Sequence, residues 1–272
     1  MRFPEAQWGR KRRVGDEKQA MRSEAAVGQY QIQYAESLES LSAEALEAMV
    51  EAGQEVVEVH RALAKTGDNV VGELLRDHET FFEWDHYPPG DVYDSEFHGQ
   101  YYYHAHTPDQ RFENEHGHFH TFMRPKGMPE GIKPAPVPGF KKPDDPDDEL
   151  SHLIAIAMTK EGFPFRLFTV NRWVTGEVWY TAGDVTTLLD RFKIDHARPS
   201  WPVNRWVTGM VALFKPQIAA LLEARDRAVA DWAEAHPDVD VYEDRELEIT
   251  SYFDISVEDH VRAVARTLTR RL

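Results

Sequence analysis

The sequence predicts an α+β fold, in which an antiparallel sheet of at least four strands packs with helices from both termini. Two pairs of β-rich runs, within 97–123 and 151–170, are each separated by a short turn and are typical of hairpins. Apolar residues recur at helical spacing after Ser42 and Ser256, towards the two ends of the chain. With 272 residues and 42% hydrophobic content, the chain is long enough to bury a substantial core.

The first hairpin is predicted from the runs FHGQYYYHAH and EHGHFHTFM. Pro108 and Asp109 supply turn chemistry between them, and the aromatic residues on either side favour strands. A symmetric register centred on residue 111 would give three cross-strand pairs: His106 with His116, His104 with His118, and Tyr102 with His120.

Six histidines in these two runs all occupy even positions: His98, His104, His106, His116, His118 and His120. Alternate side chains of a strand share a face, so the hairpin would direct these imidazoles to the same side. Three imidazole nitrogens can then converge on one ion at about 2.0–2.2 Å. The alternative is an aromatic hairpin that buries imidazoles without an ion, but each buried ring would need partners for both nitrogens. The pattern therefore predicts a metal site.

An HxH pair and a third histidine on adjacent antiparallel strands resemble the zinc site of α-type carbonic anhydrases in ligand arrangement. Further groups can come from DHYPPGDVYD, which we expect to form a loop before the first strand. His86 and Asp91 of this loop are candidate catalytic residues, as is Tyr102 on the histidine face. A phenol there can donate a proton, bind the ion or tune a redox metal, or it can simply cover the hairpin. Glu113 and Glu115 have odd parity and are expected to point away unless the turn bends them back.

Five helices are expected: one from Ser42, one over 70–82, one from about Asp184 to Phe192, one that ends at Pro237 and one from Ser256. A short strand is expected between the last two helices. His60 lies on the apolar stripe of the first helix, which indicates packing and not metal ligation.

Residues 1–20 are predicted to be a flexible basic tail, and 21–272 a single metal-binding domain. Seven prolines within 125–149 exclude regular structure there, leaving a solvated connector or an ordered flap over the site.

The heptapeptide VNRWVTG occurs twice, at 170–176 and 203–209. Two copies are too few for a solenoid, so we expect duplicated turn-plus-helix units at 170–193 and 203–226. The Asn-Arg-Trp of each copy can act as a hinge or a structural wedge. Alternatively, Arg172 or Arg205 anchors an anionic substrate beside the metal.

A net charge of −16 argues against binding to nucleic acid or to anionic membranes, which require a basic surface. No apolar run approaches the roughly 20 residues needed to span a bilayer, and we expect a cytoplasmic protein. The chain has no cysteine, so an ion must be held by imidazole, carboxylate or phenolate. The sequence does not indicate an oligomeric state.

These features favour a metal-dependent enzyme acting on a small molecule, with iron or copper as the ion and non-haem oxidase or oxygenase chemistry. Zinc or manganese in a hydrolase, hydratase or lyase that activates water is the first alternative. A non-catalytic metal-binding or sensor protein is the second. Five or six imidazoles exceed what one catalytic ion uses, so one or two ions are expected.

Overall fold

The computed structural model describes residues 38–271, and the predicted basic tail at 1–20 lies outside this range. The chain forms a six-stranded antiparallel sheet in which the strands follow one another in sequence order. The strands are β1 (Tyr87–Tyr93), β2 (Gly99–His104), β3 (Glu115–Met123), β4 (Ser151–Thr159), β5 (Pro164–Val170) and β6 (Ile249–Asp254). The predicted α+β fold, with both hairpins, is confirmed.

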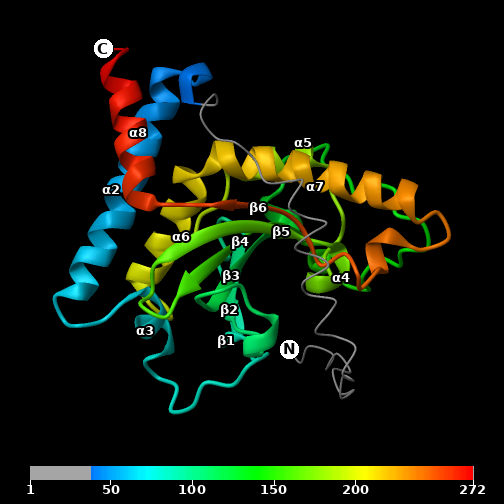
Figure 1. Ribbon diagram of the computed structural model, residues 1–272, viewed down its shortest axis with the longest axis horizontal. Helices are drawn as coiled ribbons and strands as arrows, with labels where there is room; N and C mark the ends of the chain where they lie inside the picture. The colour runs from blue at the N-terminus through cyan, green and yellow to red at the C-terminus, as the bar shows by residue number, and fades with distance from the viewer. Residues whose placement is uncertain (1–37, 272) are drawn as a thin grey trace.

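Helices cover the sheet from both ends of the chain (Figure 1). They are α2 (Ala43–Ala64), α3 (Val70–Leu75), α4 (Arg172–Thr175), α5 (Ala182–Leu188), α6 (Trp201–Leu213), α7 (Lys215–Ala235) and α8 (Val257–Thr269). Ser42 and Ser256 cap α2 and α8 as predicted, because each side-chain oxygen accepts a hydrogen bond from a backbone N–H of the first turn. The two capped helices lie side by side.

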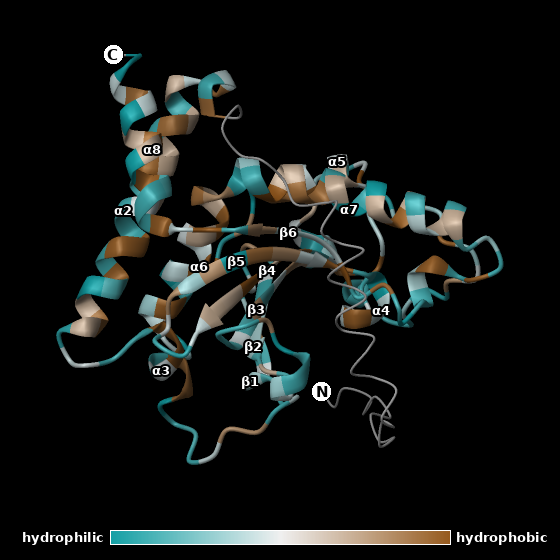
Figure 2. Cartoon of the chain, viewed as in Figure 1, coloured by the Kyte–Doolittle hydropathy of each residue, from teal (hydrophilic) through white to brown (hydrophobic). Residues whose placement is uncertain are grey.

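The two faces of the central strands differ in their environment. Tyr101, Tyr103 and Phe119 belong to the main hydrophobic core, and the Phe119 ring lies 5.3 Å from that of Trp206 on α6. Figure 2 shows β4 and β5 largely in tan and brown, whereas the ribbon around β1 and β2 is largely teal and α7 and α8 alternate between polar and apolar residues. The opposite face carries the even-numbered residues of β2 and, from His118 onwards, of β3, which include His104, His118 and His120. On β4, the small residues Ala155 and Ala157 pair with His120 and His118 and leave room for the imidazoles.

Three local expectations were wrong. The segment around YPPGDVY is strand β1 and not a loop; as an edge strand with a bulge between Tyr87 and Val92, it tolerates prolines that an interior strand would exclude. The helix expected over 70–82 ends at Leu75. Helix α5, expected from about Asp184 to Phe192, spans Ala182–Leu188. It starts earlier because its cap is Thr181, whose side-chain oxygen accepts a hydrogen bond from the Asp184 N–H.

The two copies of VNRWVTG take different structures. In the first, Asn171 caps the single turn α4, which ends at Gly176 with a φ of 67°. The second lies inside α6, where the same residues continue a 13-residue helix that starts at the Ser200 cap. The expected turn therefore exists only in the first copy, since the cap upstream of the second copy starts the helix before the repeated residues begin.

Segment 125–149 contains only the short 3-10 turns Pro125–Gly127 and Pro146–Asp148, in agreement with its prolines. It packs against 172–179: the Ala135 N–H donates to the Trp179 carbonyl, and the Arg172 guanidinium lies 4.8 Å from the centre of the Phe140 ring. These contacts make it an ordered connection between β3 and β4.

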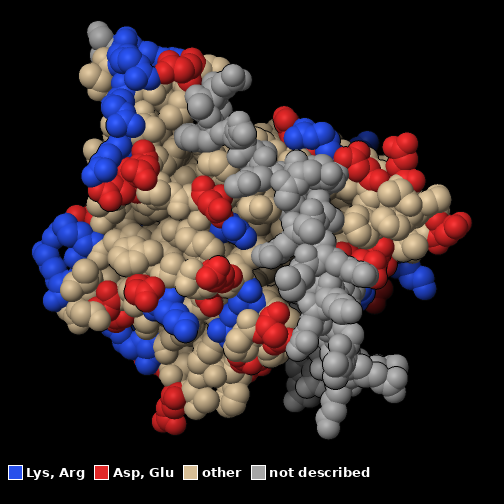
Figure 3. Space-filling view, in the orientation of Figure 1, with Lys and Arg blue, Asp and Glu red and all other residues tan. Residues whose placement is uncertain are grey.

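Acidic and basic side chains are interspersed on the face shown in Figure 3, and basic residues line α8. Among the described residues, no single helix has both the length and the apolar character to cross a membrane. The bent pair α6–α7, with 70° between its helices, meets that test on length and composition alone.

Candidate metal centre

Three buried histidines from β2 and β3 form the centre of the site. Tyr102 pairs with His120 and His104 with His118, so the predicted register is confirmed at both positions. One nitrogen from each of His104, His118 and His120 lies within 4.8 Å of the others. The Nε2 atoms of His104 and His118 are 2.8 Å apart. The triad is 1–7% exposed and can hold a metal ion.

Neighbouring side chains determine which nitrogens face the centre. Nδ1 of His118 donates a hydrogen bond to Glu115 Oε1 at 2.5 Å, so its Nε2, which faces His104, is the nitrogen with a lone pair that could bind an ion. Nδ1 of His120 lies 3.0 Å from Nε2 of His152, on β4. The remaining nitrogen of His120, Nε2, is buried and has no hydrogen-bond partner among the described residues. A buried polar atom without a partner is costly, and an ion in the triad would remove that cost.

Burial keeps two rings of the triad, His104 and His120, neutral. It lowers the pKa of His104 and of His120 well below the ordinary histidine value, and the neighbouring imidazoles lower it further. Neutral imidazole is the form that binds metals, so both rings are in the ligand state at physiological pH.

A β-bulge between Glu115 and Gly117 changes which residues of β3 face the cluster. The extra residue reverses the alternation on its N-terminal side. Glu115, expected to point away, is buried against His118, whereas His116 turns to the other side. There Nδ1 of His116 lies 2.7 Å from the Tyr103 hydroxyl, so the predicted pairing of His116 with His106 does not form.

The other two predicted ligands are placed differently. His98 precedes β2 with a φ of 61°, and its Nδ1 lies 2.6 Å from the Tyr93 hydroxyl, outside the triad. The His106 ring lies beside the triad, 5.0 Å from the ring of His104 and 5.1 Å from that of His118. Its outer face stacks on Trp84, with 4.4 Å between ring centres.

The three predicted catalytic residues adjoin the triad and one another. The Tyr102 ring lies 5.3 Å from that of His104 and 5.2 Å from that of His120. Burial raises the pKa of Tyr102 well above its ordinary value, and the charges of Asp91 and Glu177 add to this, so the phenol stays protonated. His86 stacks on Tyr102 at 3.6 Å, and its Nδ1 donates to Asp91 Oδ1 at 3.0 Å.

Comparison with known families gives one match. A family described as a domain of unknown function (DUF6969) matches residues 50–255. The chain belongs to this family. No curated protein and no solved structure matches the chain. The DUF6969 match spans the whole sheet and every histidine of the cluster, which places the candidate metal centre inside the family's domain.

The two arginines of the repeat form ion pairs with other elements of this DUF6969 domain. Arg205 on α6 donates from Nε to Glu55 on α2 at 3.0 Å, so it joins two helices that pack against each other. Arg172 pairs with Glu243 and covers the Phe140 ring. Both guanidinium groups are thus engaged in ion pairs within the fold.

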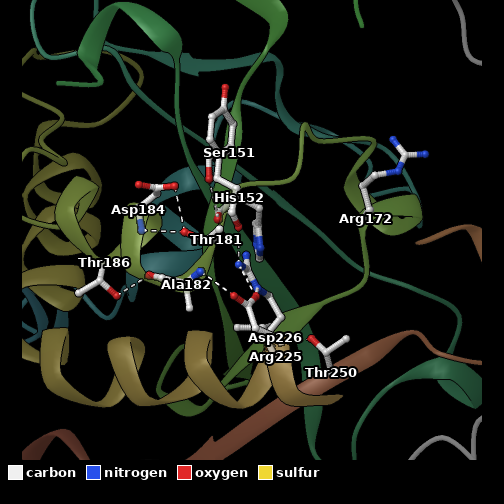
Figure 4. Close-up of polar contacts among 12 residues, drawn as sticks. Ser151, His152, Arg172, Thr181, Ala182, Asp184, Thr186, Arg225, Asp226 and Thr250 are labelled. Atoms are coloured by element: carbon white, nitrogen blue, oxygen red, sulfur yellow. Dashed lines mark hydrogen bonds and ion pairs between the residues drawn. The ribbon is translucent and has the colours of Figure 1, made fainter. Parts of the chain in front are cut away.

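Sequence analysis missed two residues, His152 and Glu177. His152 starts the second hairpin, and its even position together with the β3–β4 pairing was the signal that could have revealed it. Its backbone N–H donates to Glu177 Oε2 at 2.6 Å. Burial raises the pKa of Glu177 to about 7, and its Oε1 has no partner among the described residues. Figure 4 shows His152 above Arg225 and Asp226 of α7.

Proposed function

We propose that this chain is a metal-dependent enzyme in which His104, His118 and His120 hold a transition-metal ion and a small molecule is the substrate. One observation carries the proposal: three buried imidazoles converge, and one of them, His120, presents an unpartnered nitrogen. Packing alone gives no reason for that nitrogen, because His120 Nε2 is left without the hydrogen bond that water would supply.

Imidazole ligands suit iron and copper as well as zinc. Three ligands on one side of such an ion leave the opposite positions for substrate, as in non-haem oxygenases. We therefore favour an iron or copper oxidase or oxygenase.

The neighbouring residues would support such chemistry. Tyr102 remains a phenol and can donate a hydrogen bond or proton to a molecule at the centre. Asp91 orients His86 beside it. Glu115 and His152 hold two of the ligand rings, which fixes the direction of their free nitrogens.

A zinc or manganese enzyme that activates water is the second candidate. The hydrogen bond from His118 to Glu115 favours it, because a carboxylate behind a ligand histidine is a recurrent feature of zinc sites. In that case the ion would serve as a Lewis acid for hydrolysis, hydration or elimination.

Elemental analysis of protein purified without an affinity tag tests both candidates. We expect about one equivalent of iron or copper, lost in His104→Ala, His118→Ala and His120→Ala. His60→Ala is the control, since His60 accepts a hydrogen bond from Trp206 on the far side of the sheet and should leave the metal content unchanged. Stoichiometric zinc or manganese would support the second candidate. Equal metal content in all variants, or no retention of any supplied ion, would overturn the proposal.

A further inference from the structure

Two partly exposed aromatic rings border the buried histidine cluster. Trp84 stacks on His106 and His86 stacks on Tyr102. Trp84 is 43% exposed and the His86 side chain 42%, whereas the triad is almost completely buried. The backbone N–H of Trp84 donates to the Ala105 carbonyl, which holds the chain at Trp84 against the end of β2. A molecule approaching from solvent therefore meets these two rings next to the centre.

Asp91 holds His86 in one orientation. Its Oδ1 accepts from His86 Nδ1 at 3.0 Å, and its Oδ2 accepts from Gln100 Nε2 at 2.7 Å. Asp91 adopts a φ of 59° within the β1 bulge, a left-handed conformation that is uncommon for residues other than glycine. Such strain persists where the surrounding structure enforces it and is frequent at binding sites.

This orientation determines what His86 can bind. A carboxylate only accepts hydrogen bonds, so the proton of the neutral imidazole must lie on Nδ1, towards Asp91. Nε2 is then an acceptor, and no hydrogen bond from the described residues reaches it. The His86 ring lies 5.7 Å from that of His104, close enough for one small molecule to contact both Nε2 and an ion at the triad.

We propose that His86 Nε2 accepts a hydrogen bond from a hydroxyl group of the metal-binding substrate, and that this substrate is a small planar molecule with a phenolic or enolic hydroxyl. The proposal rests on the metal centre described above. A hydroxyl oxygen is a ligand for the ion, and the partly exposed rings of His86 and Trp84 offer flat surfaces for stacking. Asp91 acts through His86 and is a positioning residue.

Binding of 4-nitrocatechol to the metal-loaded protein tests this assignment, because its visible absorption band changes when its hydroxyl groups are bound. His86→Phe keeps a ring against Tyr102 but removes the acceptor. Asp91→Asn keeps the left-handed backbone, which asparagine tolerates, but its amide can donate to Nδ1 and so place the His86 proton on Nε2. His78→Phe is the matched control, since His78 contacts Tyr87 and lies outside the cluster.

We expect each of His86→Phe and Asp91→Asn to weaken 4-nitrocatechol binding about tenfold, as loss of one buried hydrogen bond predicts. Asp91→Asn should also shift the absorption maximum of the bound ligand, a change that a purely structural role would not produce. His78→Phe should match the unsubstituted protein, and 4-nitroveratrole, which lacks hydroxyl groups, should not bind.

Metal content measured in each sample separates the two proposals. If all variants retain the ion and bind 4-nitrocatechol equally, the role of His86 is wrong and the metal centre stands. Equal binding of 4-nitrocatechol and 4-nitroveratrole also overturns it, since the hydroxyl would then be irrelevant. If the unsubstituted protein retains no ion, both proposals fail.

Discussion

Glu115 accepts a hydrogen bond from Nδ1 of His118 at 2.5 Å, although strict alternation along β3 would place the two side chains on opposite faces. The bulge between Glu115 and Gly117 brings them together. One irregularity in one strand thus supplies the carboxylate that fixes the tautomer of a histidine in the proposed metal centre.

Replacing this carboxylate should weaken metal binding while leaving the ligands in place. We expect Glu115→Gln to lower metal affinity by about 10–100-fold, because Gln no longer stabilises the His118 N–H as a charged acceptor does. Competition with a chromophoric chelator measures the affinity. His116→Phe, one residue away but on the opposite side, is the control and should bind metal normally.

Metal removal should lower thermal stability. An ion that binds only the folded chain adds about 2.7 kcal/mol at a concentration 100 times its Kd. For a domain of this size that corresponds to roughly 5–10 °C in Tm. Scanning calorimetry with and without EDTA measures the shift. His120→Ala should show no difference between the two conditions; a similar EDTA effect in that variant would contradict the assignment.

Gly117 should not tolerate a side chain. A Cβ there would lie 2.4 Å from the His104 carbonyl oxygen and 2.7 Å from the Tyr103 hydroxyl. We expect Gly117→Ala to lower the free energy of unfolding by about 2 kcal/mol or more and to weaken metal binding, because β2 and β3 must separate. Urea unfolding provides the measurement. Gly183→Ala in α5, where the nearest atom is 4.0 Å away, should be neutral or slightly stabilising.

Glu177 should make stability depend on pH above neutrality. Burial raises its pKa from 4.5 to about 7, so the folded chain holds a proton that the unfolded chain releases. The stabilisation contributed by Glu177 is fully present below pH 4.5 and is lost as the pH rises through about 7. Glu177→Gln removes the charge, so it should be more stable than the unsubstituted protein by roughly 3 kcal/mol at pH 8 and equal to it near pH 4. Urea unfolding at both pH values checks the sign.

His60 should contribute in the opposite direction. Burial lowers its pKa to about 4, and its Nε2 accepts a hydrogen bond from the Trp206 indole. The unfolded chain takes up a proton near pH 6.5 that the folded chain resists, so stability falls as pH decreases from 6.5 towards 4. The slope of unfolding free energy against pH is proportional to the number of protons taken up on unfolding. In His60→Gln this number should be smaller by about one in this pH window. An unchanged slope would show that His60 titrates normally.

The register of the first hairpin was predictable because two simple rules determine it: side chains alternate along a strand, and a short turn fixes the pairing. The same rules failed for Glu115 and His116, since a bulge breaks the alternation and leaves no clear mark in the sequence. His152 and Glu177 were missed because their positions depend on how β4 and the α4 turn pack against β3. Likewise, the context of each VNRWVTG copy determined its structure, although the residues are identical.

The order of the strands has a consequence for assembly of the protein. Every neighbour in the sheet is also a neighbour along the chain, and the triad comes from a single hairpin. Closing so short a loop carries little entropic cost, and contacts between nearby segments form early in folding. A cation captured by β2 and β3 would therefore act on the nascent polypeptide as a template, onto which the later strands add one after another.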